Sequence, residues 1–421
     1  MILTKYKLGE ILDVTRGASL SGEYYATEGE YIRLTCGNFD YQNNCFKENK
    51  SKDNLYYVGD FKSEFLMEEG DIITPLTEQA IGLLGSTAII PESGKYIQSQ
   101  DVAKIICKED LLDKDFAFYL ISSALVKQQL SAAAQQTKIR HTSPDKIKDC
   151  TVWIPELSEQ KRIGKLLRSI DRKIELNRAI NQNLEAMAKQ FYDYWFVQFD
   201  FPNEEGKPYK SSGGEMVWNE KLKRKIPNEW DNCKLKDFIN LFDSKRIPLS
   251  SKDREERKGN YPYYGATGIM DYVNEYIFDG DYILLAEDGS TSDSKGFPIV
   301  QYIWGKNWVN NHAHIILPKN EQYLMFTYQM LRSIPAKQIE TGSIQKKISQ
   351  ENLCEYNMVL PNSILIEKYE SIISPLWEKR KLCIEEINAL IKQRDELLPL
   401  LMNGQASVNS DLSTLFNPLC C

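Results

Sequence analysis

The feature that most constrains this chain is an internal duplication. Tyr6–Leu12 (YKLGEIL) is echoed by Cys233–Ile239 (CKLKDFI), and Asp101–Ile106 (DVAKII) is echoed by Asn311–Ile316 (NHAHII). Each echo follows its counterpart by about 210 to 230 residues, a period far too long for a solenoid repeat. The 421 residues are therefore expected to fold as two copies of one globular domain, with further segments between and after them.

Each copy has the pattern of an α+β domain. Gly70–Thr74 and Gly280–Ala286 are turns followed by β-rich apolar runs, and Gly, Pro and Asn residues separate such runs throughout. Short helices are predicted at Lys114–Leu130 and Glu321–Ile334. A domain of about 150 residues is long enough to bury a substantial core.

Two segments have the pattern of long helices instead. From Ser158, the predicted N-cap, to Phe196 apolar residues recur at alternating spacings of three and four. Ser363–Met402 repeats this pattern, with Pro375 expected to kink the helix or to start its continuous part. A lone helix of about 58 Å cannot bury such a stripe, so we expect the two helices to pack antiparallel as a coiled coil. The predicted pairing positions are Ile163, Leu167, Ile170, Ile174, Leu184, Phe191, Leu376, Ile387, Leu390 and Leu397.

Composition excludes several classes of protein. A formal net charge of −7 argues against a chain that binds nucleic acid through its whole surface, but it leaves room for a local basic patch. No apolar run approaches the length of a membrane span, and Met1–Lys5 lacks the apolar core of a signal peptide. The nine cysteines form no C-x-x-C pair, so a reducing cytoplasm is the expected setting.

Common catalytic motifs are absent from the sequence. There is no P-loop, no G-x-G-x-x-G, no H-E-x-x-H and no G-x-S-x-G. His312 and His314 could share a strand face and hold a metal ion, but no Cys or carboxylate cluster in the sequence completes that site. We therefore interpret them as surface imidazoles and expect no metal. Glu287–Asp288 follows a strand, as catalytic carboxylates often do, yet the start of a turn is the favoured interpretation.

What remains is a set of polar and basic loops at similar points of both copies. Lys and Arg in such loops neutralise phosphates, and Gln can read adenine bidentately. Each loop alone is typical of a solvated surface, whereas recurrence in a duplicated domain favours a binding surface. The predicted DNA contacts are Thr77, Gln79, Gln98, Gln100, Gln136, Lys138, Arg140, Ser290, Lys306, Asn307, Asn310, Ser343, Gln345, Lys346 and Lys347.

Over residues 1 to about 405 the chain resembles the specificity subunit of type I restriction–modification enzymes. The resemblance is strongest in the helices and moderate in the two globular copies. It is carried by Leu166–Asn177, Leu184–Ala188, Trp195–Asp200, Gln393–Gly404, Tyr261–Ala266 and Ala286–Gly289. The tail after Gly404 matches no family pattern.

The resemblance implies two target-recognition domains separated by two long antiparallel helices related by a pseudo-two-fold. The corresponding division is a first recognition domain at 1–156, a central helix at 157–199, a linker at 200–230, a second recognition domain at 231–361, a distal helix at 362–404 and a tail at 405–421. Each domain would read one half of a bipartite DNA target, and the helices would set the spacer between the halves.

The resemblance also implies which chemistry belongs to partner proteins. The chain itself would be non-catalytic and cytoplasmic, in a bacterium or archaeon, and it would bind double-stranded DNA. Two methyltransferase (modification) subunits would use S-adenosylmethionine, and two restriction (motor–nuclease) subunits would use ATP and Mg²⁺. Two alternatives remain open: a stand-alone DNA nuclease, and a coiled-coil adaptor for other proteins.

Overall fold

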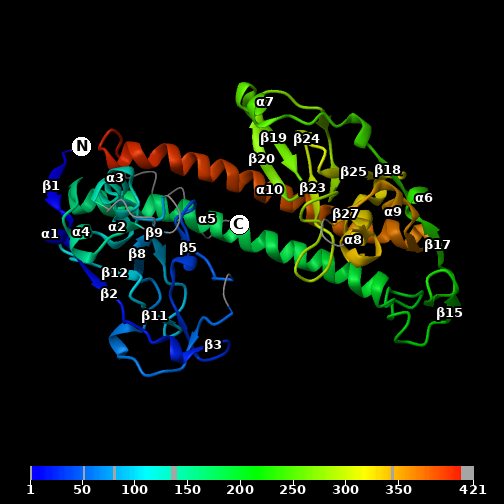
Figure 1. Cartoon of the computed structure of the whole chain (residues 1–421), viewed down its shortest axis with the longest axis horizontal. Helices are drawn as coiled ribbons and strands as arrows, with labels where there is room; N and C mark the ends of the chain where they lie inside the picture. Colours follow the sequence, from blue (N-terminus) through cyan, green and yellow to red (C-terminus); the bar gives the residue numbers. More distant parts are fainter. Residues whose placement is uncertain (1, 51–52, 79–81, 134–139, 343–345, 409–421) are drawn as a thin grey trace. The chain divides into compact units, whose positions relative to one another are not determined.

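The computed structural model describes residues 2–50, 53–78, 82–133, 140–342 and 346–408. The chain divides into two compact units. Unit 1 consists of Met1–Asn177 and Glu385–Cys421, and unit 2 of Arg178–Ile384. The division passes through both long helices, so each unit contains one globular domain together with part of each helix (Figure 1).

Unit 1 is built on two four-stranded sheets. The first has the order β10 (Ala88–Ile89), β8 (Ile72–Pro75), β12 (Val102–Cys107), β2 (Leu12–Arg16). The second has the order β11 (Tyr96–Ile97), β4 (Tyr31–Arg33), β7 (Tyr56–Tyr57), β3 (Tyr25–Ala26). Three two-stranded pairs are β1 (Thr4–Lys7) with β14 (Thr151–Ile154), β9 (Thr77–Glu78) with β13 (Arg140–His141), and β5 (Phe39–Asp40) with β6 (Cys45–Phe46).

Short helices cover the first sheet of unit 1. They are α1 (Leu8–Ile11), α2 (Lys114–Ile121), α3 (Ala124–Ala133) and α4 (Pro144–Lys148). The single helix predicted at Lys114–Leu130 is therefore wrong, because it is divided at Ser122–Ser123. The Ser122 hydroxyl donates to the Phe118 carbonyl and the Ser123 hydroxyl accepts from the Val126 amide. Such local side-chain bonds compete with a continuous helix.

Unit 2 repeats this plan with longer strands. Its first sheet has the order β18 (Ile239–Leu241), β25 (Ala313–Pro318), β22 (Tyr282–Ala286), β23 (Val300–Ile303), and its second β20 (Gly268–Val273), β19 (Lys258–Gly265), β24 (Lys306–Val309), β21 (Phe278–Asp279). The two-stranded pairs are β17 (Asp231–Lys234) with β28 (Asn357–Leu360), β26 (Glu340–Thr341) with β27 (Lys347–Ile348), and β15 (Met216–Asn219) with β16 (Arg224–Pro227). The short helices are α6 (Leu235–Phe238), α7 (Ser251–Glu256), α8 (Leu324–Ser333) and α9 (Gln350–Glu355).

The strand registers confirm the predicted duplication. In the first sheet of each unit the central strands pair antiparallel, with Pro75 opposite Val102 in unit 1 and Ala286 opposite Ala313 in unit 2. In the second sheet a parallel pair recurs, β11 with β4 and β24 with β19. Each domain is also closed by an antiparallel pair of its first and last strands. Two copies of one α+β topology result.

The long helices are α5 (Leu157–Tyr192) and α10 (Ser363–Met402). In unit 1, Ile170 and Ile174 of α5 pack with Ile387 of α10, and Leu390 and Leu397 lie against them. Ile163 and Leu167 join the domain core, which also contains Leu401 and Met402. In unit 2, the Tyr369 hydroxyl of α10 donates to the Ala188 carbonyl of α5 at 3.1 Å. Early residues of one helix thus meet late residues of the other, which is the expected antiparallel pairing within each unit.

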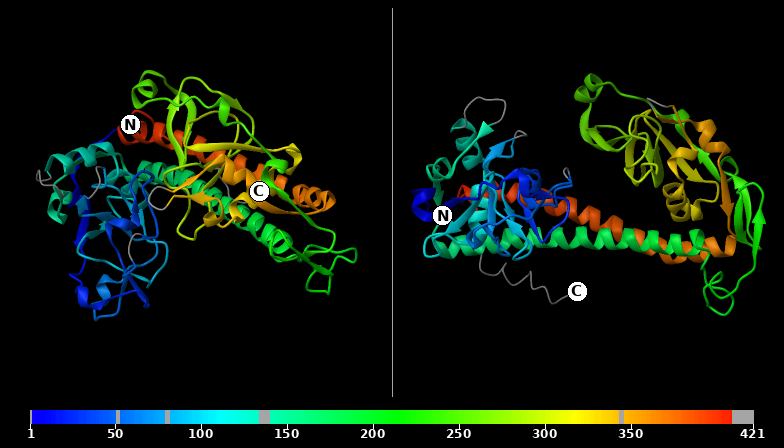
Figure 2. Two further views of the ribbon diagram at one scale, coloured as in Figure 1. Left: turned by 45° about the vertical axis from the view of Figure 1, so that its right-hand side comes forward. Right: turned by 60° about the horizontal axis from the view of Figure 1, so that its bottom comes forward.

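The other pairing positions lie in unit 2. Phe191 and Leu376 are half-buried against its large core, and Leu184 is half-buried. That core gathers Tyr192, Trp195 and Phe196 at the end of α5, where the helix continues as a π-helical turn over Asp193–Val197. In unit 1 the end of α10 has the same role and lies beside the start of the chain (Figure 2). An added Cβ at Gly404 would lie 3.1 Å from Leu3. Each globular domain is therefore completed by residues from both long helices.

One detail of the helix prediction is wrong, and one of the two alternatives given for Pro375 is excluded. The helix begins at Leu157, one residue before the predicted N-cap Ser158, and the Glu156 carbonyl accepts from the Glu159 and Gln160 amides. Pro375 does not start the continuous part of α10, which already begins at Ser363. The backbone bonds on either side are sufficient to carry the helix past one missing amide donor.

Candidate functional site

In both domains the two central strands of the first sheet end in the same hydrogen-bonded arrangement. In unit 1 the Leu76 amide donates to the Asp101 carbonyl at 2.8 Å, and in unit 2 the Glu287 amide donates to the His312 carbonyl at 2.9 Å. A polar side-chain pair then joins the two strands. We call these regions edge 1 (76–78, 98–101, 140–141) and edge 2 (287–290, 310–312, 346–348). Many of the predicted DNA-contact residues lie there.

The side-chain pair at each edge occupies matching positions. At edge 1 the Thr77 hydroxyl donates to Asp101 Oδ1 at 3.2 Å. At edge 2 His312 Nδ1 lies 2.7 Å from Asp288 Oδ1. His312 is therefore an exposed imidazole with a carboxylate partner, and Glu287–Asp288 leads out of the strand as the turn interpretation predicted. Thr77 is largely buried, so its hydroxyl serves the fold.

Edge 2 stands on a buried ionic network that sequence reasoning missed. His314 is 0% exposed, and its Nδ1 lies 2.6 Å from Asp243 Oδ2. Arg246 Nη1 lies 2.8 Å from Glu287 Oε2, and Lys347 Nζ lies 3.1 Å from Glu287 Oε1. The expectation of a surface imidazole at 314 is wrong, because β25 is a central strand covered on both faces. The statement that no carboxylate completes a cluster there is wrong as well.

Both carboxylates in this network are stabilised as anions. Burial alone would raise the pKa of Asp243, but hydrogen bonds from His314, the Ile315 amide and Gln350 lower it overall. For Glu287, burial again opposes ionisation, and Arg246 and Lys347 lower the pKa. Ligand atoms of Asp243, Glu287 and His314 lie within 4.8 Å of one another. Since two cations already contact these carboxylates, the donor set is typical of an ion-pair network rather than of a metal site.

Edge 1 has a different charge arrangement. Leu76 and Ala103 stand where unit 2 has Glu287 and His314, as the paired registers show. Its cations lie nearer the surface: Arg140 Nη1 is 3.5 Å from Glu78 Oε2, and Arg16 Nε donates to the Gln100 carbonyl at 2.8 Å. Both edges thus present basic side chains held by partners, although with different residues.

Four predicted DNA contacts are buried and do not fit that role: Thr77, described above, and Gln98, Asn307 and Asn310. Gln98 is 1% exposed and donates to the Thr15 and Val102 carbonyls. Asn307 is 0% exposed and donates to the Gly305 carbonyl. Asn310 is 3% exposed and accepts from the His312 amide. Their side chains complete backbone hydrogen bonds at strand ends, a common use of polar residues that the sequence pattern alone does not distinguish from ligand contact.

Other predicted contacts lie at the surface. Gln100, Ser290, Lys306, Lys346 and Lys347 are exposed, and Arg140 is half-exposed. Lys346 pairs with Glu340 at 3.1 Å. Lys306 begins β24, four residues before the 310–312 segment of edge 2, and its ammonium lies 4.7 Å from the centre of the Tyr276 ring. The remaining predicted positions, Gln79, Gln136, Lys138, Ser343 and Gln345, lie outside the described residues.

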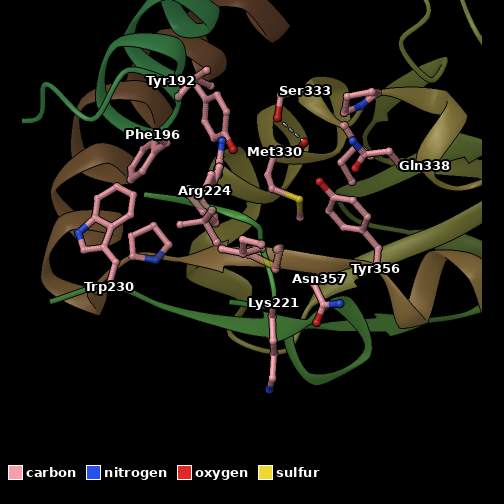
Figure 3. Close-up of a pocket in the computed structure, with 18 of the residues that line it drawn as sticks. Tyr192, Phe196, Lys221, Arg224, Trp230, Met330, Ser333, Gln338, Tyr356 and Asn357 are labelled. Carbon is pink, nitrogen blue, oxygen red and sulfur yellow. Dashed lines mark hydrogen bonds between the residues drawn. The ribbon is translucent and has the colours of Figure 1, made fainter. Parts of the chain in front are cut away.

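A pocket of about 660 Å³ lies elsewhere in unit 2. We call it the hairpin pocket, because the β15–β16 hairpin forms one wall. The end of α5, the end of α8 and strand β28 form the others. Tyr192, Arg224, Met330 and Tyr356 point into the same space, whereas Lys221 points away from it (Figure 3). None of the pocket-lining residues was predicted as a binding site from the sequence, since they come from separate segments of the chain.

The comparisons with known proteins agree with the duplicated fold. The family model described as type I restriction modification DNA specificity domain matches residues 3–186 and again residues 227–386. This duplicated α+β chain with paired long helices is thus of the DNA specificity class. The chain belongs to the family of type I restriction modification DNA specificity domains.

Individual relatives carry the same description. The type I restriction enzyme MjaIX specificity subunit of Methanocaldococcus jannaschii is 22% identical over 330 residues, covering 74% of this chain and 73% of that protein. A putative type I restriction enzyme specificity subunit of Haemophilus influenzae is 34% identical over 142 residues, covering 34% of this chain and 35% of the other.

A solved structure shares the fold. The crystal structure of the type I restriction–modification S subunit from M. genitalium superposes with a TM-score of 0.61 at 18% identity, covering 96% of each chain. Among the described residues, no helix is both long enough and apolar enough to cross a membrane.

Proposed function

We propose that this chain is the DNA-reading subunit of a type I restriction–modification complex, with each domain reading one half of a bipartite target. The observation that carries the proposal is the repetition of one strand-end edge in two domains. At each edge a cross-strand polar pair lies beside basic side chains, Arg16 and Arg140 at edge 1 and Lys346 and Lys347 at edge 2. Different residues at equivalent positions would let the two domains read different sequences.

The paired helices would set the spacing between the half-sites. At 1.5 Å per residue, the 36 residues of α5 extend about 54 Å. Half-sites read from one face of DNA lie about 34 Å apart or a multiple of that distance. Inserting seven residues into both α5 and α10 adds two turns and keeps the stripe in register. The added length of about 10 Å corresponds to roughly three base pairs, so the tolerated spacer should lengthen by that amount.

The chemistry would belong to partner proteins. In this proposal two modification subunits supply S-adenosylmethionine-dependent adenine methylation, and two restriction subunits supply ATP- and Mg²⁺-dependent translocation and cleavage. This chain would be non-catalytic and would bring double-stranded DNA to them. Its overall charge of −7 is compatible with this role, because the DNA contacts would be confined to small patches.

The direct test maps methylated adenines in a host that expresses this chain with its modification subunits. We expect one asymmetric sequence with two specified parts and an unspecified spacer. Omitting this chain should abolish methylation at that sequence. Methylation of a continuous sequence, or methylation that does not depend on this chain, would contradict the proposal. Purified chain alone with Mg²⁺ is expected to leave DNA uncut, and cutting by the chain alone would point to the nuclease alternative.

A further inference from the structure

The hairpin pocket has the composition of a protein-docking site. Its aromatic lining includes Tyr192, Phe196 and Trp230. The Phe196 ring centroid lies 5.2 Å from that of Tyr192 and 5.9 Å from that of Trp230. Interfaces are enriched in such aromatic residues, and a pocket of this size readily accepts one or two large side chains. If the pocket stayed empty, the residues on its walls would lack van der Waals contacts on that side.

Hydrogen bonds and a cation–ring contact hold the walls of the pocket in place. The Ser333 hydroxyl donates to the Met330 carbonyl at 2.7 Å (Figure 3), and the Leu235 amide donates to the Tyr356 carbonyl at 2.8 Å. The Arg224 guanidinium lies 5.3 Å from the Phe199 ring. Burial raises the pKa of both Tyr192 and Tyr356, so their hydroxyls remain hydrogen-bond donors at neutral pH. The pocket is therefore preformed, which lowers the entropic cost of filling it.

Apolar side chains are exposed around the opening. Val197 is 45% exposed and Phe297 is 38% exposed, and both line the pocket. Exposed apolar residues gathered at a pocket with a polar rim mark interaction sites more often than isolated ones do.

The rim is positively charged, in contrast to the chain as a whole. In the described segment 221–225, Lys221 and Arg224 line the pocket, and neither has an ion pair among the described residues. Glu355 also lines the pocket, but hydrogen bonds from Lys234 and Lys236 lower its pKa to about 2. Lys234 and Lys236 already pair with this carboxylate, so Arg224, which points into the pocket, gives the rim its positive charge.

We propose that the hairpin pocket docks an acidic segment of a modification subunit, which inserts an apolar or aromatic side chain between Tyr192, Met330 and Tyr356. Arg224 and its neighbours would pair with the acidic residues that flank the inserted side chain. The choice of partner rests on the proposed function, and the choice of segment rests on the charge and lining of the pocket. Opposite charge at the rim speeds docking, and the buried anchor supplies most of the affinity.

The test measures the affinity between the purified chain and its purified modification subunit by titration calorimetry without DNA. Met330→Trp fills the pocket and Arg224→Glu reverses the rim charge. Each is expected to weaken the complex by about tenfold or more. Lys252→Glu, on exposed helix α7, makes the same charge change away from the pocket and should leave the affinity unchanged. Thermal unfolding of each free variant confirms that it is folded.

The outcomes separate the two proposals. If the unaltered chain fails to bind the modification subunit, the proposed function is wrong. If it binds and a folded Met330→Trp binds equally well, only the docking inference is wrong. If Arg224→Glu weakens the affinity of the free chain for DNA and leaves subunit binding unchanged, the rim belongs to a DNA surface and the docking inference is again overturned.

Discussion

The two long helices meet their domains at matching positions with different side chains. Gly164 is the eighth residue of α5 and Glu370 the eighth of α10, while Asp171 and Trp377 are the fifteenth residues of the same helices. All four are buried within their own unit. Since the domains share one topology, these positions show how the duplication has diverged.

At the eighth position the difference concerns the capping of a short helix. In unit 1 the Asp113 carboxylate accepts from the Phe116 amide at the start of α2, and an added Cβ at Gly164 would lie 2.8 Å from that amide. In unit 2 the residue before α8 makes no side-chain cap. Glu370 of α10 supplies the carboxylate instead, accepting from the Phe326 amide at 2.7 Å. One domain caps its own helix, and the other is capped by the long helix.

At the fifteenth position unit 1 has a buried ion pair, whereas unit 2 has an aromatic cluster. Asp171 accepts from the Tyr119 hydroxyl, and Arg394 of α10 donates to it at 2.9 Å. Trp377 instead packs on Tyr328 of α8, with ring centroids 5.1 Å apart, and under the Arg380 guanidinium. A long helix placed on the wrong domain would bury a carboxylate or an indole without its partners. The divergence therefore favours correct pairing of each helix with its domain.

The largest expected effect comes from the aromatic junction. Trp377→Ala removes a side chain that is 1% exposed, and it should cost about 4 kcal/mol of unfolding free energy. Urea unfolding, followed by hydrogen exchange of α8 amides, measures the loss in unit 2. Leu382→Ala, at a position on the same helix that is 60% exposed, should change little. If the two substitutions had equal effects, the aromatic cluster would not be what stabilises this junction.

The ionic junction should be nearly as sensitive. Arg394→Met leaves the Asp171 carboxylate buried with its cation gone, and it should cost about 3 kcal/mol in urea unfolding. The control Lys392→Met lies two residues away on the exposed face of α10. If Asp171→Asn in the Arg394→Met background restores part of the lost unfolding free energy, the two side chains are coupled. If it restores none, the two side chains are not coupled.

Glu370 makes unit 2 sensitive to pH. Burial, opposed by the bonds from the Phe326 amide and Ser374, raises the pKa of this carboxyl from 4.5 to about 7. The folded chain then binds a proton that the unfolded chain has released, so stability falls as pH rises from about 4.5 to 7, by about 3 kcal/mol. Glu370→Gln should remove this slope, whereas Glu367→Gln, on the exposed face, should keep it. A slope that persists in Glu370→Gln would assign it to another group.

Gly164→Ala is expected to have the smallest of these effects. In most helices the substitution stabilises, because glycine has poor helix propensity. Here the new Cβ would meet Asp113 and the Phe116 amide, so we expect a loss of about 2 kcal/mol, visible as faster exchange at the start of α2. Lys165→Ala, the exposed neighbour, is the control. A stabilised Gly164→Ala would mean that α2 shifts freely and that the eighth position does not matter.

The duplication of the domain and the pairing of the long helices could be predicted from the sequence, because both produce periodic patterns of residues. The echo of Asp101–Ile106 in Asn311–Ile316 predicted two copies, and these segments are matching central strands, β12 and β25. The alternating stripe with Ile170, Ile174 and Ile387 predicted the helix pairing. Register and heptad spacing constrain many residues at once, so single exceptions such as Pro375 do not hide them.

The site was harder to predict because it depends on single contacts. Gln98 and Asn310 have the side chains of base-reading residues, yet both complete backbone hydrogen bonds. The network around His314 joins residues from four segments. His314, Glu287 and Lys347 were each singled out from the sequence, but nothing in the sequence linked them to Asp243 or Arg246. Composition does not reveal such partners, whereas an alignment of the two halves position by position would have pointed to edge 2.

The central claim is that the two domains read their half-sites independently, and domain exchange tests it most directly. Residues 1–156 are replaced by the corresponding domain of another member of the family, and methylated adenines are mapped in the host genome with the same modification subunits. The account predicts that one half of the recognised sequence changes while the other half and the spacer stay the same. A change in both halves, or in neither, would contradict it.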